Sequence, residues 1–169
     1  MRFWGKLAAA ALFATISGGY ADDNKKSFSD GNFVDQASTI GRAEVVAGQI
    51  AVQRASHENV KKFAARMIED HSKANNDLLI IVSDERIPIP DRLTADQEKA
   101  LNHLNGESLK DFDKEYMKHM VEGHEKAVEL FGKAAKECKD AKLKAFAEKT
   151  LPTIKEHLSM AKKVKDELK

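Results

Sequence analysis

Apolar and small residues recur at three- and four-residue spacing along most of the chain after residue 30, which is the pattern of an amphipathic α-helix. This pattern predicts four long helices, over residues 31–54, 57–85, 108–136 and 141–167, and one short helix over 95–104. Asp30, Ser56 and Asp140 are suitable N-caps. Thr94 and Gln97 form the capping-box pattern that opens the short helix. No segment of useful length alternates with the period of two expected for a half-buried strand.

Prolines mark two interruptions of the helical pattern. Pro88 and Pro90 end the second helix, because proline lacks an N–H group and restricts the residue before it. Pro152 falls inside the last helix, where we expect a kink near Lys149–Thr150 or a division into two segments.

Four amphipathic helices with short links predict an all-α fold, an antiparallel four-helix bundle with a short extra helix between helices two and three. We expect an up-down-up-down order, in which the turns near Ser56 and Lys139 share one end. One domain would span residues 30–168, after a loose polar tail over 22–29.

The first 21 residues have the three-part layout of a secretory signal. Arg2 and Lys6 precede the apolar run Leu7–Ile16, and a cut after Ala21 would follow small residues. The segment predicts a periplasmic or otherwise exported bacterial protein; an uncleaved anchor is the alternative. The apolar run has about half the length that a membrane-spanning helix needs, so no stable membrane span is expected after its removal.

Charge and cysteine content exclude several classes of function. The chain has 28 Lys and Arg against 27 Asp and Glu, so no basic excess favours a nucleic-acid partner. The single cysteine, Cys138, excludes an internal disulfide and any multi-cysteine zinc site. No P-loop, dinucleotide fingerprint or nucleophile elbow occurs. We therefore assign no catalytic residues; whether the protein is an enzyme and which proteins it contacts stay open.

Four polar residues interrupt the apolar stripes, one on each long helix: Glu44, His71, His124 and His157. Counted from the shared end of the predicted bundle, all four fall within roughly 9 Å along its axis, at about 1.5 Å per residue. A carboxylate and three imidazoles suit one transition-metal ion, such as zinc, copper, iron or manganese. A buried polar network that fixes helix register is the alternative interpretation.

Neighbouring residues bear on both interpretations. Met67, Met120 and Met160 each lie about one turn from one of the histidines, and thioethers favour Cu(I), although methionine also fills cores. Four acidic residues beside the histidines could orient the imidazoles, or could simply face water: Asp70, Glu122, Glu125 and Glu156.

Several segments resemble the bacterial exported family called domain of unknown function 4142, which is grouped with ferritin-like helical bundles. The most specific are RMIEDH, which ends at His71, FDKEYM at 112–117 and LPTIKEHL at 151–158. The resemblance spans residues 33–162 and implies a periplasmic or envelope helical bundle, without an assigned reaction.

Ferritin-like di-iron proteins carry a Glu-x-x-His pattern on two helices. Here the residues three before the histidines are apolar: Ile68 before His71, Val121 before His124 and Ile154 before His157. We therefore expect a mononuclear metal site or none. Two functions follow as hypotheses: an exported protein that binds a transition metal through the Glu/His layer, or a non-catalytic envelope protein whose polar layer is structural.

Overall fold

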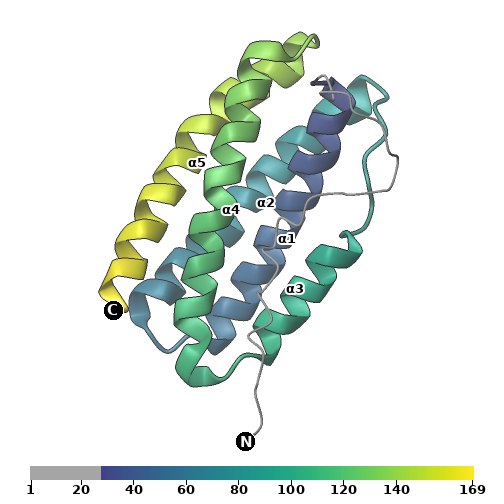
Figure 1. Ribbon diagram of the computed structural model, residues 1–169. Coiled ribbons are helices and arrows are strands. Elements are labelled where there is room, and N and C mark those ends of the chain that lie inside the picture. The colour runs from purple at the N-terminus through teal and green to yellow at the C-terminus, as the bar shows by residue number, and fades with distance from the viewer. Residues whose placement is uncertain (1–27) are drawn as a thin grey trace, which may run out of the picture.

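The computed structural model describes residues 28–169, which form five α-helices and contain no strand (Figure 1). The helices are α1 (Asp30–Arg54), α2 (Glu58–Asp84), α3 (Ala95–Gly106), α4 (Leu109–Glu137) and α5 (Ala141–Glu167). The all-helical fold and the short extra helix between the second and third long helices are confirmed. The predicted signal peptide, and the predicted tail up to residue 27, lie outside the described residues.

The helix starts follow the capping chemistry of the sequence. Asp140 caps α5, and Thr94 forms the predicted capping box with Gln97 at the start of α3. Two caps differ by one residue from the prediction: Ser29 caps α1, and His57 caps α2 through its ring. Asp30 and Ser56, the predicted caps, instead make hydrogen bonds between helices at the two ends of the bundle.

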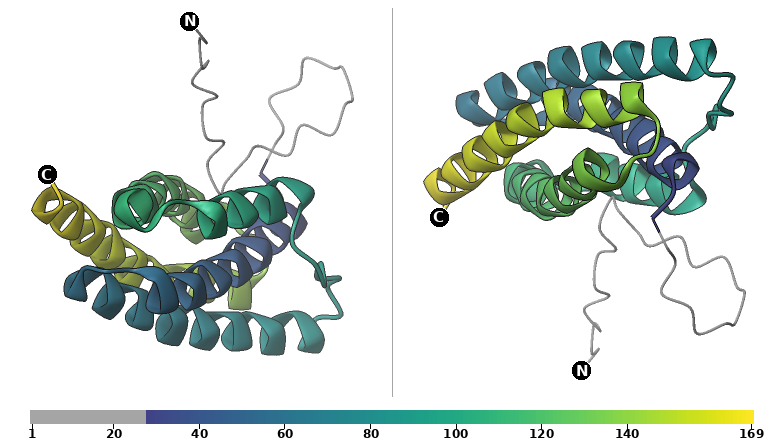
Figure 2. Two further views of the ribbon diagram at one scale, coloured as in Figure 1. Left: turned by 90° about the horizontal axis from the view of Figure 1, so that it is seen from below. Right: turned by 90° about the horizontal axis from the view of Figure 1, so that it is seen from above.

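The long helices pack as two pairs. α1 lies against α2, α4 lies against α5, and the pairs meet through α2–α5 and α1–α4 contacts. The short α3 contacts α1 and α4 from outside (Figures 1 and 2). The four long helices therefore surround one interior, in the order α1, α2, α5, α4.

The direction of the second pair differs from the up-down-up-down prediction, which is wrong. The carboxylate of Asp113, near the start of α4, accepts hydrogen bonds from the backbone N–H groups of Ser56 (3.2 Å) and His57 (2.8 Å). α4 thus begins at the end where α1 meets α2. At the opposite end, the carboxylate of Asp30 accepts the N–H of Asp140 (2.8 Å), so the α4–α5 turn lies beside the start of α1.

The segment between α2 and α4 explains this reversal. It covers residues 85–108 and contains α3, whose twelve residues advance by about 18 Å at 1.5 Å per residue. It therefore returns the chain along the molecule before α4 begins, so α2 and α4 run in the same direction. One long crossover of this kind is a feature of ferritin-like folds.

Two apolar clusters fill the interior. One includes Phe63 and Tyr116, near the α1–α2 turn. The other includes Phe33 and Phe131, whose rings meet edge to face at 5.2 Å, near the α4–α5 turn. The polar residues of the candidate site come from the helix segments between these clusters.

α5 remains one helix through Pro152, so it is not divided into two. It changes direction along its length in the end-on views (Figure 2), as expected where proline removes one hydrogen bond of the helix.

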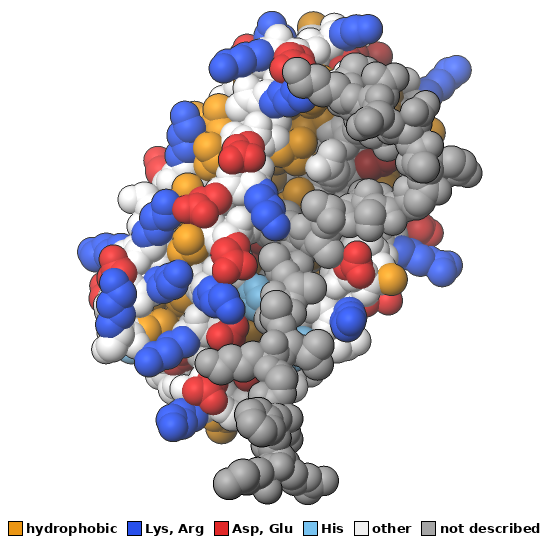
Figure 3. All heavy atoms as spheres, viewed as in Figure 1, with side chains coloured by type: hydrophobic (Ala, Val, Ile, Leu, Met, Phe, Trp, Pro, Cys, Tyr) orange, Lys and Arg blue, Asp and Glu red, His pale blue; other side chains and the backbone are white. Residues whose placement is uncertain are grey.

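Basic and acidic side chains are interspersed over the described part of the face in Figure 3. Among residues 28–169, no helix has both the length and the apolar character needed to cross a membrane.

Candidate metal centre

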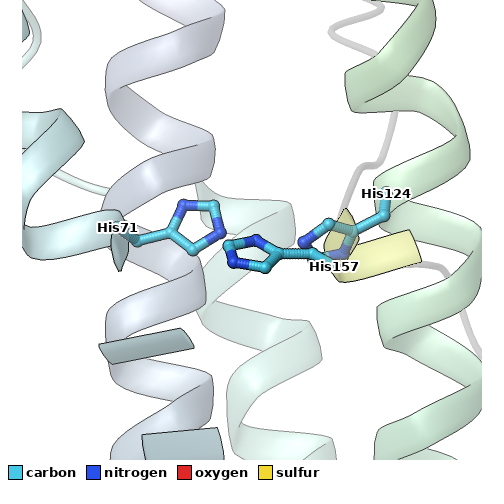
Figure 4. A group of neighbouring side chains, drawn as sticks. All are labelled: His71, His124 and His157. Atoms are coloured by element: carbon cyan, nitrogen blue, oxygen red, sulfur yellow. The ribbon is translucent and has the colours of Figure 1, made fainter. Parts of the chain in front are cut away.

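Three histidines from three helices meet inside the molecule. His71 of α2, His124 of α4 and His157 of α5 have ring centroids 5.4–5.8 Å apart (Figure 4). One nitrogen of each ring belongs to a set whose members all lie within 4.8 Å of one another. The structure therefore brings together three of the four residues predicted from the sequence.

The helical repeat explains why these rings point inward. His71 and His124 lie four residues after the fully buried Met67 and Met120, and His157 lies three residues after the buried Ile154. Residues three or four apart share a helix face. His124 and His157 are each 1% exposed; His71 is partly exposed, but its Nε2 atom is fully enclosed.

Hydrogen bonds fix the tautomers of two rings. Nδ1 of His124 lies 2.8 Å from the carbonyl oxygen of Met120. Because a carbonyl only accepts, Nδ1 carries the proton and donates it. Nε2 of His157 likewise donates to the Asp70 carboxylate at 2.8 Å. In the neutral rings, Nε2 of His124 and Nδ1 of His157 are therefore left with lone pairs.

Those lone pairs have no partner in the described part of the chain. The buried atoms without a hydrogen bond include Nε2 of His71, Nε2 of His124 and Nδ1 of His157. Buried polar atoms nearly always have a partner in folded proteins. Three such nitrogens side by side indicate that the site is completed by something that accepts electron pairs or donates protons.

All three rings are held neutral. Burial lowers the pKa of His71 well below its usual range, and charge on the other two rings lowers it further. Burial, together with the charge of His157, lowers the pKa of His124 to about 4. Burial also lowers the pKa of His157, although Asp70 partly opposes this. Neutral imidazole is the form that binds metal ions.

Asp70 connects the triad to the surface. Burial alone would raise its pKa, but hydrogen bonds from His157 and Arg66 outweigh this, and the pKa is lowered. Arg66 donates to Asp70 (Nε–Oδ2, 3.1 Å) and to Glu156 (2.9 Å). A charged carboxylate behind a histidine is the usual support for a metal-binding ring. Of the four acidic residues predicted to orient the imidazoles, the structure places Asp70 against His157 and Glu156 behind it through Arg66; Glu125 pairs with Lys162 instead.

Glu44 lies apart from the triad. It is 2% exposed, but its carboxylate is not in the set of ligand atoms within 4.8 Å. Burial raises its pKa to about 8. Neither of its oxygens, nor the buried hydroxyl of Tyr116, has a partner among residues 28–169. Burial and the charge of Glu44 both raise the pKa of Tyr116, so the two buried groups influence one another without a hydrogen bond between them.

His119 is a further buried histidine. It lies off the main apolar stripe of its helix, a position at which the sequence pattern predicts a solvent-facing side chain, yet it is 2% exposed. α3 packs against α4, and charge on His103 of α3 lowers the pKa of His119, after the larger effect of burial. α4 therefore buries a second face, which a single stripe does not reveal.

Comparisons with known proteins support the family and the fold. The family model described as Domain of unknown function (DUF4142) matches residues 17–164. No curated protein matches the chain.

The solved structures of similar fold have low sequence identity to this chain. "CopM in the Cu(II)-bound form" is 15% identical, with a TM-score of 0.73 over 85% of this chain and 99% of that one. "CopM in the Cu(I)-bound form" is 16% identical, with a TM-score of 0.68 over 81% and 95%. A DUF305 fragment from Deinococcus radiodurans is 10% identical, with a TM-score of 0.72 over 81% and 95%. These likenesses concern the fold.

Proposed function

The chain belongs to the DUF4142 family, and we propose that it is an exported four-helix-bundle protein that binds one transition-metal ion through His71, His124 and His157. The family description assigns no activity, so the proposal is argued from the site.

The observation that carries the proposal is the set of three inward-facing, unpartnered nitrogens on neutral rings. A structural polar network, the alternative interpretation, joins donors to acceptors. In this triad, the ring protons of His124 and His157 are already used outward, on Met120 and Asp70. Their inward nitrogens can only accept, so they cannot satisfy each other, and Nε2 of His71 makes no hydrogen bond to either of them. A metal cation is a partner that several lone pairs can share.

The spacing suits such an ion. A point equidistant from three atoms that are 4.8 Å apart is about 2.8 Å from each, which is the upper limit here. Metal–imidazole bonds are about 2.0–2.1 Å long. Each nitrogen would therefore need to move by less than about 1 Å, within the reach of small side-chain rotations.

We place copper first among the candidate metals. Imidazole nitrogens suit zinc, copper and iron alike, so the donor set alone leaves the choice open. The CopM structures of similar fold are described as Cu(I)- and Cu(II)-bound. Met67 and Met120 are fully buried one turn from two of the histidines, and thioethers favour Cu(I).

The proposed place of action is the periplasm, or another compartment reached by export. The signal-like residues 1–21 support this. Without a predicted nucleophile or cofactor motif, the proposal is metal binding or transfer. It gives Glu44 no bond to the ion; the Glu44 variant described in the Discussion decides that point.

Elemental analysis of untagged protein, isolated from the periplasm of an expression host, tests the proposal. We expect close to one metal ion per chain in the wild type and loss of that metal in a His71→Ala plus His124→Ala variant. The matched control replaces two histidines outside the triad, His57→Ala plus His103→Ala, and should keep the metal. Substoichiometric metal in the wild type, or equal metal in both double variants, would refute the assignment.

A further inference from the structure

A small cavity lies against the histidine triad. Its volume is about 30 Å³, and His71 and His157 form part of its wall. A cavity needs roughly 10–15 Å³ to hold one water molecule. This one therefore has room for one or two waters, or for another ligand of that size.

The rest of the wall is mostly apolar. Leu78, Phe131 and Ile154 are buried side chains that line it from three helices. The partly exposed Thr150 and Thr153 belong to the same wall, on α5. The wall thus combines buried apolar side chains with polar side chains of α2 and α5.

Three protein nitrogens do not complete the coordination of zinc or copper(II). Zinc sites with three protein ligands bind water or substrate at the fourth position, and copper is also found with four or more ligands. The cavity supplies space beside two of the three rings. Most of the bundle interior is filled by the apolar clusters described above, so this is the side on which a further ligand has room.

We propose that the metal site keeps a coordination position open toward this cavity and binds there a small exogenous ligand of one to three non-hydrogen atoms. Water and linear anions such as azide belong to this class; a tetrahedral, strongly hydrated anion such as sulfate is too large. The inference rests on the proposed function, because the ligand binds to the ion that the triad holds.

Titration of the copper(II)-loaded full-length protein with sodium azide tests the inference. Bound azide adds an azide-to-copper charge-transfer band and changes the copper electron paramagnetic resonance spectrum. We expect both changes with azide and neither with sodium sulfate. Copper loaded in the wild type without an azide response would overturn the inference and leave the proposed function standing.

Filling the cavity tests its location. Ala74 lines the cavity three residues after His71 and is only partly buried, so Ala74→Leu adds volume there. Ala65→Leu, on an exposed position of the same helix, is the control. We expect the azide dissociation constant to rise by at least about tenfold in Ala74→Leu, from the crowding of the cavity, and to stay unchanged in the control.

Copper content is measured in every variant. If Ala74→Leu misfolds or loses copper, Thr153→Leu fills the same cavity from α5 and should show the same loss of azide affinity. Unchanged azide affinity in a folded, copper-loaded cavity variant would overturn the placement of the ligand. A wild-type protein that takes up no copper would refute the choice of copper, and the inference with it.

Discussion

Replacing Glu44 by glutamine should change how stability depends on pH. Burial raises the pKa of Glu44 from 4.5 to about 8, so the folded metal-free protein keeps a proton that the unfolded chain releases above pH 4.5. The folded state binds more protons between these values, and the wild type therefore loses stability as pH rises from 4.5 to about 8. At 1.36 kcal/mol per pH unit, the loss is at most about 5 kcal/mol. Glutamine does not titrate.

Urea unfolding of the metal-free wild type and the Glu44→Gln variant at pH 5, 6.5 and 8 measures this effect. The difference between the two proteins isolates Glu44, because they share every other titrating group. We expect the free energy of unfolding of the variant, relative to that of the wild type, to rise by several kcal/mol between pH 5 and 8. Glu69→Gln, on an exposed position of α2, should show no such gain. Parallel pH profiles of wild type and Glu44→Gln would refute the reasoning.

The same variant decides whether Glu44 contacts the ion. If the three imidazoles hold the metal alone, Glu44→Gln keeps its metal content and its affinity. If the carboxylate is a ligand, as the sequence suggested, affinity falls while the triad remains intact.

Three further predictions concern other parts of the molecule. Asp70→Asn should weaken metal binding by about 10–100-fold, measured by competition with a chromophoric chelator, because it removes the charged acceptor behind a ligand ring; unchanged affinity would contradict this role. In the metal-free Glu44→Gln background, stability should fall by at least about 3 kcal/mol as pH drops from 6.5 to about 4, because buried His124 resists the protonation that the unfolded chain accepts and the pKa values of His71 and His157 are lowered as well; a flat profile would contradict it. Gly48→Ala should lower the thermal midpoint, since the added carbon would lie 2.8 Å from a side-chain atom and 3.0 Å from a backbone oxygen of α2. Gly132→Ala, with nothing within 4 Å, should raise it.

The helices were predictable because their signals are local. Capping groups and three- and four-residue spacing depend on neighbours along the chain, so the predicted segments match the observed ones to within a few residues. The shift of a cap from Asp30 to Ser29 has a tertiary cause. The Asp30 carboxylate is used by the N–H groups of the α4–α5 turn, far away in sequence.

The order of helix directions was not predictable from the same signals. It depends on whether residues 85–108 close a turn or cross the molecule, and helix periodicity is identical in both cases. The three histidines nevertheless lie together, as predicted, although the directions of α4 and α5 were predicted wrongly. His157 lies sixteen residues after the first residue of α5, Ala141, and ten before its last, Glu167. Residues near the middle of a helix keep nearly the same height when its direction is reversed.

The position of Glu44 along the bundle axis was not enough to predict whether its side chain would join the histidines. The rise per residue fixes the level of a side chain, but the direction in which it points depends on how each helix is rotated and crosses its neighbours. α2, α4 and α5 turn their histidines toward one another. α1 contributes Gly41 to the cavity wall beside the triad, while Glu44 and Tyr116 lack partners among the described residues.

The energetics of the triad favour a bound ion over a purely structural role. The inward nitrogens of His124 and His157 are acceptors, and each costs about 1–3 kcal/mol unless a donor or a cation meets it. Apolar residues of similar volume would fill the same space without that cost. The outward hydrogen bonds to Met120 and Asp70 hold two rings in the orientation that keeps their lone pairs directed inward. The surroundings thus hold the rings in the arrangement that three ligand nitrogens of one ion need.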